Sequence, residues 1–123
     1  MRRVLPSILL VVVLAIPFTP MLSFAEVVGI HHGFMTGNKF MTLSSDDQSI
    51  YAMGLVDGMV LAPMFEAPKA KTKWLETCIE GMTNMQVAAM LRKELESNPG
   101  TWHHSAHTAM YRAMLKGCPG SPK

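Results

Sequence analysis

Histidine and methionine are the residue types in this 123-residue chain that could hold a metal ion. His103 and His107 are four residues apart, with His104 between them, and His31-His32 forms a second pair. On a helix that spacing would put two imidazoles on one face, and methionine thioethers suit Cu(I). A tight site needs three or four ligands, and methionine readily fills small cores. We therefore expect no cofactor, and we keep a copper or zinc site as a lesser alternative.

The sequence contains no recognisable catalytic set. Cys78 could act as a nucleophile beside a histidine, and Asp57 could act as an acid. However, the chain has no Gly-x-Ser-x-Gly motif and no glycine loop that would cradle a phosphate. An exported cysteine with one partner is usually structural, and an aspartate in the middle of a helix is more often a buried, hydrogen-bonded contact. We expect a protein that is not an enzyme.

The first 25 residues predict a cleavable export signal. Arg2 and Arg3 precede nine uninterrupted apolar residues, 8–16, and Ser23-Phe24-Ala25 offers small residues for cleavage near Ala25. A membrane span would need roughly 20 apolar residues, so we expect release into the periplasm. Residues 26–123 would then form one domain. Without Arg2 and Arg3, 9 of the 11 basic residues face 9 acidic ones, a balance that argues against nucleic acid or an anionic membrane as a partner.

The two cysteines, Cys78 and Cys118, both lie in the part of the chain that would be exported. In an oxidising compartment such a pair is more often bridged than free. We therefore predict a disulfide, which would stabilise the fold by roughly 4 kcal/mol on the chain-entropy model. Two unpaired buried thiols are the alternative.

The exported part predicts an all-α fold, a small bundle of four or five short helices closed by that disulfide. Apolar residues recur at helical spacing, and no alternating β-branched run competes with them. The expected helices cover residues 33–43, 45–62, 74–80, 83–98 and 101–116. An exposed connection is expected at residues 63–73.

Several helix ends carry specific signals. Ser45 with Gln48, and Thr83 with Gln86, each fit a capping box. Gly117 suits a left-handed helix end. On the other side of the fourth helix from its apolar stripe, we expect exposed charges at Arg92, Lys93, Glu94 and Glu96.

Gly54 and Gly58 lie one turn apart inside the second expected helix. Glycine weakens a helix interior by about 1 kcal/mol. Close packing of another backbone would explain the two glycines, and we expect such a neighbour beside them.

The run Tyr51-Ala52-Met53-Gly54-Leu55-Val56-Asp57-Gly58 resembles the Tyr-x-x-Gly-x-x-Asp helix of the Rap/Tai family. These are immunity proteins against peptidoglycan amidase toxins of type VI secretion systems. The likeness continues in order over residues 40–119. Its further elements are Cys78, Gly81-Met82, Thr83, Gln86, Asn98-Pro99, three alanines in the last helix, and Cys118-Pro119. The chain departs from the family in ending Cys-Pro instead of Pro-Cys, and in its long 63–73 connection.

This resemblance implies a small helical periplasmic protein that binds a cognate amidase effector and occludes its active site. It also implies that the chain could form a homodimer, as members of the family often do. Two loops could reach the amidase, residues 66–73 or residues 97–101, and the likeness favours the second. The contact residues would be Ser97, Asn98, Pro99 and Trp102, although Trp102 could equally belong to the core. A general periplasmic helper of the chaperone type remains the other class of function.

Overall fold

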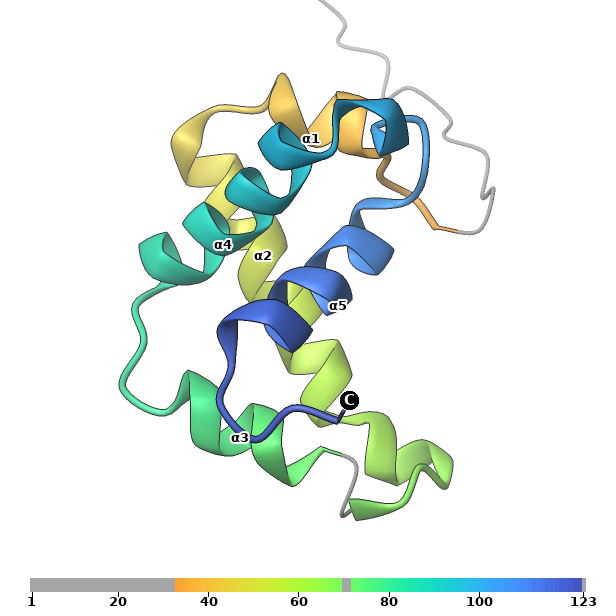
Figure 1. The fold of residues 1–123 in the computed structure, drawn as a ribbon, viewed down its shortest axis with the longest axis vertical. Helices are drawn as coiled ribbons and strands as arrows, with labels where there is room; N and C mark the ends of the chain where they lie inside the picture. Colours follow the sequence, from red (N-terminus) through yellow and green to blue (C-terminus); the bar gives the residue numbers. More distant parts are fainter. Residues whose placement is uncertain (1–32, 70–71, 123) are drawn as a thin grey trace, which may run out of the picture.

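The computed structural model describes residues 33–69 and 72–122. The expected signal segment and His31-His32 lie outside these residues. Within them the chain is all helical, as predicted, with no strand (Figure 1). The elements are α1 (Gly37–Met41), α2 (Ser45–Val60), the 3-10 turn η1 (Ala62–Phe65), α3 (Lys73–Ile79), α4 (Asn84–Ser97), the 3-10 turn η3 (Pro99–Thr101) and α5 (Ala106–Gly117). None of the helices in the described part is long and apolar enough to cross a bilayer.

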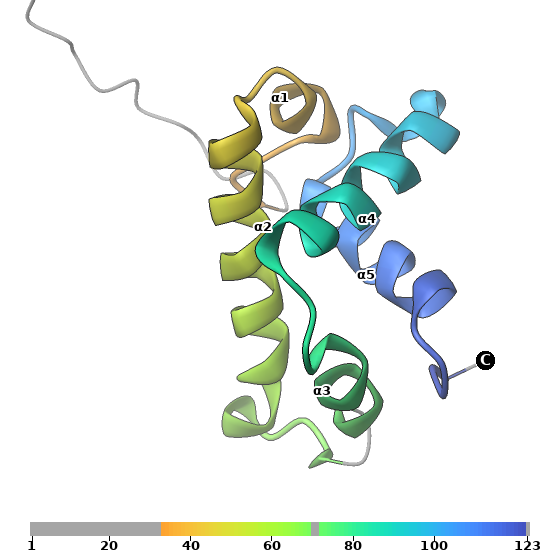
Figure 2. The ribbon, with the colours of Figure 1, turned by 90° about the vertical axis from the view of Figure 1, so that its left-hand side faces the viewer.

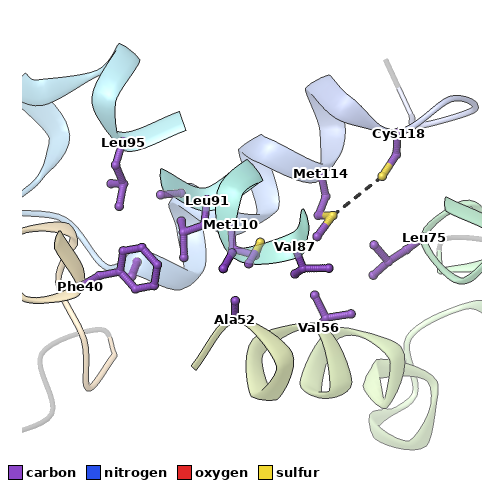
Figure 3. Packing of buried hydrophobic residues seen from close by; sticks show 13 residues of the cluster. Phe40, Ala52, Val56, Leu75, Val87, Leu91, Leu95, Met110, Met114 and Cys118 are labelled. Carbon is purple, nitrogen blue, oxygen red and sulfur yellow. Dashed lines mark hydrogen bonds between the residues drawn. The ribbon is translucent and has the colours of Figure 1, made fainter. Parts of the chain in front are cut away.

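Three helices enclose the core. α4 and α5 pack together and against one side of α2, while α1 lies at one end of the bundle and α3 at the other (Figure 2). The fully buried large side chains come from α1, α4 and α5, and they meet the small face of α2 (Figure 3). They are Phe40, Leu91, Leu95, Met110 and Met114. Much of the apolar contact is therefore made by methionine and alanine, which suits a small domain with few bulky residues.

The N-cap of α2 lies one residue earlier than the sequence suggested. Ser44, rather than Ser45, is the N-cap, and its hydroxyl accepts a hydrogen bond from the Asp47 backbone N–H at 3.1 Å. The same hydroxyl donates to the Asp47 carboxylate at 2.7 Å. The predicted capping box of Ser45 and Gln48 is therefore wrong, because Ser44 caps the helix and the Gln48 side chain bonds elsewhere in the protein. By contrast, the second capping box, between Thr83 and Gln86 at the start of α4, is present with both hydrogen bonds.

The Gln48 side chain takes no part in the cap. It is buried and links three helices. Its amide nitrogen donates to the backbone carbonyls of Phe40 and Leu43, each at 3.1 Å. Its amide oxygen accepts from Arg92 of α4, with 3.0 Å to Nε and a second contact to the guanidinium. Every hydrogen-bonding position of the buried amide is used, so its burial carries no unpaired polar atom.

Glu94 links α4 to α5 through a second buried polar group. It was expected on the exposed face of α4, but it is buried and pairs with Arg112 at 3.1 Å and Lys116 at 2.7 Å. Burial alone would raise the pKa of Glu94. The hydrogen bonds and charges of Lys116 and Arg112 outweigh burial and lower this pKa below its ordinary value. Periodicity misplaced Glu94 because its two cations come from another helix.

The last helix starts later than predicted, at Ala106 instead of near residue 101. The Ala106 N–H donates to the Met35 carbonyl at 2.8 Å, and Thr36 forms an isolated bridge with Ser105. This pairing holds the chain extended just before the helix. His103 therefore lies in a turn, and the idea that His103 and His107 share one helical face is wrong.

Gly117 has a different role from the one predicted. It remains helical, and Cys118 is the C-cap, so there is no left-handed end at this position. A Cβ on Gly117 would lie 2.5 Å from the terminal methyl carbon of Met90. Met90 of α4 therefore packs closely on Gly117, through the end of a flexible side chain that a small shift could move aside.

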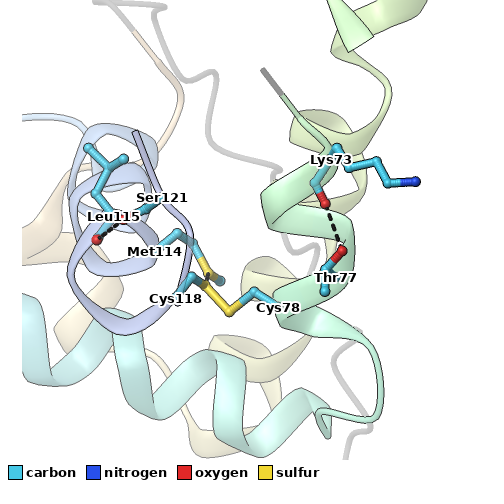
Figure 4. Close-up of a disulfide and its surroundings, with 7 residues drawn as sticks. All are labelled: Lys73, Thr77, Cys78, Met114, Leu115, Cys118 and Ser121. Atoms are coloured by element: carbon cyan, nitrogen blue, oxygen red, sulfur yellow. Dashed lines mark hydrogen bonds between the residues drawn. A yellow bond between two sulfur atoms is a disulfide. The ribbon is translucent and has the colours of Figure 1, made fainter. Parts of the chain in front are cut away.

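The predicted disulfide is present and joins α3 to the residue that follows α5 (Figure 4). The Cα atoms of Cys78 and Cys118 lie 5.4 Å apart. α3 contributes only Leu75 as a buried residue, so the bridge is a major part of what holds this helix. The Met114 sulfur lies 3.8 Å from the Cys118 sulfur, which is a van der Waals contact because a bridged sulfur carries no hydrogen.

Replacing both cysteines, with Cys78→Ser and Cys118→Ser, should lower the free energy of unfolding by roughly 4 kcal/mol, since the open chain gains entropy when unfolded. Urea titration followed by circular dichroism measures this. Wild-type protein titrated with a reductant should reproduce the loss. Identical curves with and without reductant would show that the bridge carries no stability.

Glu94 should make stability depend on pH. Because its folded-state pKa is lowered from 4.5, Glu94 contributes its full stabilisation above about pH 4.5 and loses it as the pH falls from there through the lower folded-state pKa. Glu94→Gln should cost about 2 kcal/mol at pH 7 and flatten the fall in stability below about pH 4.5. Thermal unfolding across this range is the measurement. The matched control is the exposed Glu96→Gln on the same helix, and an equal effect there would contradict the role of Glu94.

Candidate functional site: the loop between α4 and α5

The candidate site is residues 98–105, hereafter the α4–α5 loop, together with Ser97 at the end of α4. Its first turn is built by local hydrogen bonds. The Asn98 amide donates to the Glu94 carbonyl at 2.8 Å, and the Thr101 hydroxyl donates to the Asn98 carbonyl at 2.9 Å. Pro99 opens the 3-10 turn that follows, since proline cannot continue α4 but suits a first helical position. The predicted helix end at Asn98-Pro99 is therefore correct.

Trp102 ties the loop to the core. Its indole Nε1–H donates to the Leu95 carbonyl at 2.7 Å, in the last turn of α4, and the same carbonyl also accepts from the Asn98 backbone N–H at 2.9 Å. The ring is partly buried and packs against the core cluster. The alternative that Trp102 belongs to the core therefore fits its position. Its indole holds the loop to the end of α4.

The start of α1 clamps the far half of the loop. The Asn38 N–H donates to the Trp102 carbonyl at 2.8 Å, and the Gly37 N–H donates to the His104 carbonyl at 3.0 Å. These donors belong to the first turn of α1, where backbone N–H groups have no partner within the helix. The loop and the helix start therefore satisfy each other's backbone, and the loop is fixed along both of its halves.

Gly37 makes this clamp possible, a role that the sequence did not reveal. It is buried, and a Cβ added to it would lie 2.7 Å from a methyl carbon of Leu95 and 3.1 Å from the Trp102 backbone. No side chain fits there without moving the loop. The only signal in the sequence was Gly37 itself, three residues before the apolar pair Phe40-Met41.

The clamp leaves a set of side chains on the outside of the protein. The exposed residues of the site are Ser97, Pro99, Gly100, His103 and His104. The rings of His103 and His104 lie 4.0 Å apart between centroids, while His107 stands on α5 with its ring near the Ser105 hydroxyl. Among the described residues no group of three or more histidines, cysteines or carboxylates is placed to hold a metal ion.

The other motif residues divide between core and surface. Tyr51 packs on Phe40, with 5.9 Å between ring centroids, and burial raises its pKa. Asp57 was expected to be a buried contact but is exposed. Gly54 and Gly58 were expected beside another backbone, yet an added Cβ on either would meet nothing within 4 Å. Only Gln86, in its capping box, has the role assigned to it.

The second candidate loop, residues 66–73, is described only in part. Glu66 adopts a left-handed conformation with φ 68° and caps η1. The backbone of the described part bonds locally, from Ala67 N–H to the Ala62 carbonyl and from Thr72 N–H to the Lys69 carbonyl. The α4–α5 loop is fixed by two other parts of the chain, so it is the stronger candidate for a rigid binding element.

Two surface hollows lie beside α4. One, of about 260 Å³, is bounded by Glu94, Lys93 and Lys116, and the other, of about 410 Å³, by Ser49, Arg92 and Glu96. Glu94 and Arg92 already use their polar atoms within the fold.

No family model, curated protein or solved structure matches the chain.

Gly37→Ala should loosen the clamp. The added methyl would push the Trp102 backbone and the Leu95 side chain away from α1, at a cost of about 2 kcal/mol of stability. Amide hydrogen exchange at Gly37, Asn38 and Ala106 should speed up together, because these N–H groups bond across the clamp. Gly100→Ala is the matched control, since nothing lies within 4 Å of its added Cβ. Equal protection in both variants would show that the clamp does not depend on Gly37.

Proposed function

We propose that this chain is a periplasmic immunity-type binding protein that neutralises a peptidoglycan amidase by occluding its active site, and that it is not an enzyme. The observation that carries the proposal is the clamped α4–α5 loop. It projects Pro99 and Gly100 from a backbone held by Trp102 and by the start of α1. The ordered likeness to the Rap/Tai family over residues 40–119 supplies the class of partner.

A rigid loop suits occlusion for a physical reason. Binding costs free energy for every loop or side chain that must be ordered, and a loop already fixed in the free protein avoids that cost. Ser97, Asn98 and Pro99 would contact the rim of the amidase cleft, and Trp102 would hold the backbone behind them. An inhibitory complex of this kind buries roughly 1,200–2,000 Å² in total, so α4 and the His103-His104 turn would also take part.

The compartment forms part of the same proposal. The disulfide between Cys78 and Cys118 is consistent with an oxidising environment. Together with the apolar segment 8–16 and the cleavage residues at 23–25, it supports export to the periplasm and removal of residues 1–25. The immunity domain would be residues 26–123, and it would meet the amidase where peptidoglycan is exposed to attack.

A general periplasmic helper is the second candidate, and one observation favours it. Met64 and Phe65 in η1 leave 78% and 81% of their surface exposed, and methionine-rich surfaces adapt to many partners. An adaptable surface of this kind would bind unfolded chains without a fixed loop. We place the amidase first because the clamped loop has a defined shape that a helper would not need.

Co-expression tests the proposal directly. A candidate peptidoglycan amidase, directed to the periplasm, should lyse cells, and co-expression of the wild-type protein should prevent lysis. Gly100→Arg adds bulk at the loop tip, where an added Cβ meets nothing, so it should leave the fold intact while raising the Kd by about a hundredfold or more. Circular dichroism, binding calorimetry and survival measure these effects.

The matched control is Glu76→Arg, on the exposed surface of α3, which should protect as well as the wild type. Lysis despite the wild-type protein, or full protection by Gly100→Arg, would count against the role of this loop. Binding to unfolded substrate chains without preference would favour the helper function instead.

A further inference from the structure

The first of the two hollows beside α4 adjoins the candidate site, because Ser97 is one of its lining residues. Its volume of about 260 Å³ is several times the roughly 30 Å³ that one water molecule occupies in the liquid, so a side chain from a partner can enter it. The other lining residues belong to the C-terminal parts of α4 and α5 and are Met90, Lys93, Glu94, Ala113, Lys116 and Gly117. We call this cavity the lysine hollow.

Positive charge is in excess around the lysine hollow. Arg112 and Lys116 each hold one carboxylate oxygen of the buried Glu94, at 3.1 Å and 2.7 Å. Lys93 is a further cation, exposed on α4, and no described residue pairs with its ammonium group. The next carboxylate along α4, that of Glu96, lines the second hollow and not this one. Three cations therefore stand against one carboxylate, and the surplus attracts an anion.

The donors available to such an anion are ammonium groups. An ammonium has three N–H donors, and Lys116 gives one of them to Glu94. The Ser97 hydroxyl hydrogen is already donated to the Lys93 carbonyl, at 2.8 Å. The C-terminal part of a helix also has no free backbone N–H groups, since its unpaired groups are carbonyls. An anion in the hollow would therefore be held by Lys93 and Lys116.

The rest of the lining is apolar and sets the shape of the anion. Met90 brings its terminal methyl group close to Gly117, and Ala113 beside them is buried. A carboxylate on a short apolar stem would lay the stem on these residues and place its charge at the lysines. A glutamate side chain has this form. A free phosphate has no stem, and the partial negative charge at the ends of α4 and α5 disfavours a dianion.

We propose that the lysine hollow receives a glutamate side chain of the partner protein, with its carboxylate held by Lys93 and Lys116. The inference rests on the proposed function, in which that partner is a peptidoglycan amidase covered by the α4–α5 loop. Ser97 belongs to both surfaces, so a partner seated on the loop lies beside the hollow. The amidase would accordingly present a glutamate close to its cleft, and charge complementarity at this point would help to select the cognate enzyme.

Butyrate tests the hollow without any amidase, because it carries the stem and the carboxylate of a glutamate side chain. Butyramide is its uncharged counterpart. In an NMR titration of the exported, oxidised protein, butyrate should shift the amide signals of Ser97 and Gly117 to saturation, with a Kd in roughly the millimolar range. Butyramide should not. Lys93→Met should raise the Kd for butyrate at least about fivefold, and Lys39→Met, the same exchange on α1, should leave it unchanged.

Two outcomes of this titration would overturn the inference. Equal shifts with butyrate and butyramide would mean that the hollow does not recognise charge. Shifts that grow with butyrate without saturating, or that are the same in Lys93→Met and the wild type, would mean that no carboxylate site exists there. The melting temperature should be equal in all three proteins, because the side chains of Lys93 and Lys39 are exposed.

Binding kinetics with a candidate amidase test the occupant. Lys93→Met should raise the Kd about tenfold, slow association and weaken the dependence on salt, and Lys93→Glu should raise the Kd about a hundredfold. Lys39→Met should change none of these quantities. In a double-mutant cycle, one Glu→Lys exchange beside the amidase cleft should weaken binding to the wild type and restore most of the affinity lost in Lys93→Glu.

This inference and the proposed function can fail separately. If the wild type binds the amidase and Lys93→Met binds it as tightly, or Lys39→Met loses as much affinity, the lysine hollow is not a recognition site, while the proposed function stands. If no Glu→Lys exchange rescues Lys93→Glu, the occupant is not a glutamate. If the wild type binds no amidase, the proposed function fails together with the partner named here, and the butyrate titration still decides whether the hollow takes a carboxylate.

Discussion

The backbone pairing between the start of α1 and the α4–α5 loop is the constraint on which the candidate site depends. The N–H groups of Gly37 and Asn38 have no partner within α1. They donate to the carbonyls of His104 and Trp102 in the loop, so each segment satisfies the other's backbone. Irregular backbone usually lies on the surface because its polar groups need water. Here a second segment takes the place of water, so a loop can keep one shape without regular structure of its own.

Buried polar groups do for the helices what the clamp does for the loop. The core holds few bulky side chains, and alanine and methionine form much of it. Such a core is apolar but leaves the angles between helices loosely defined. Gln48 fixes α1, α2 and α4 through four hydrogen-bonding contacts, and Glu94 fixes α4 to α5 through Arg112 and Lys116. Because both groups have all their partners, they add direction to the packing without an unpaired charge.

Local patterns in the sequence were sufficient for the features that depend on neighbouring residues. The capping box of Thr83 and Gln86, the buried stripe of α4 and the pairing of the two cysteines all follow from such patterns, and all three are correct. The errors arise where a distant segment competes. Ser44 caps α2 in place of Ser45, while Gln48 bonds to Arg92 on another helix. α5 starts late because Met35 and Thr36 pair with Ala106 and Ser105. The clamp itself could not be predicted, since its hydrogen bonds join backbone groups some 65 residues apart, and these groups carry no residue signature.

Glycine shows most clearly why residue type alone is ambiguous. A missing side chain can serve the fold in two ways here: Gly37 lets the loop approach α1, and Gly117 makes room for Met90. Gly54 and Gly58 look the same in the sequence, and close packing was expected beside them as well, but no described residue lies within 4 Å of a Cβ added to either. Both need no unusual backbone angle, and no described residue approaches the space where a Cβ would lie, so the described part of the fold gives no reason for a residue that weakens its own helix.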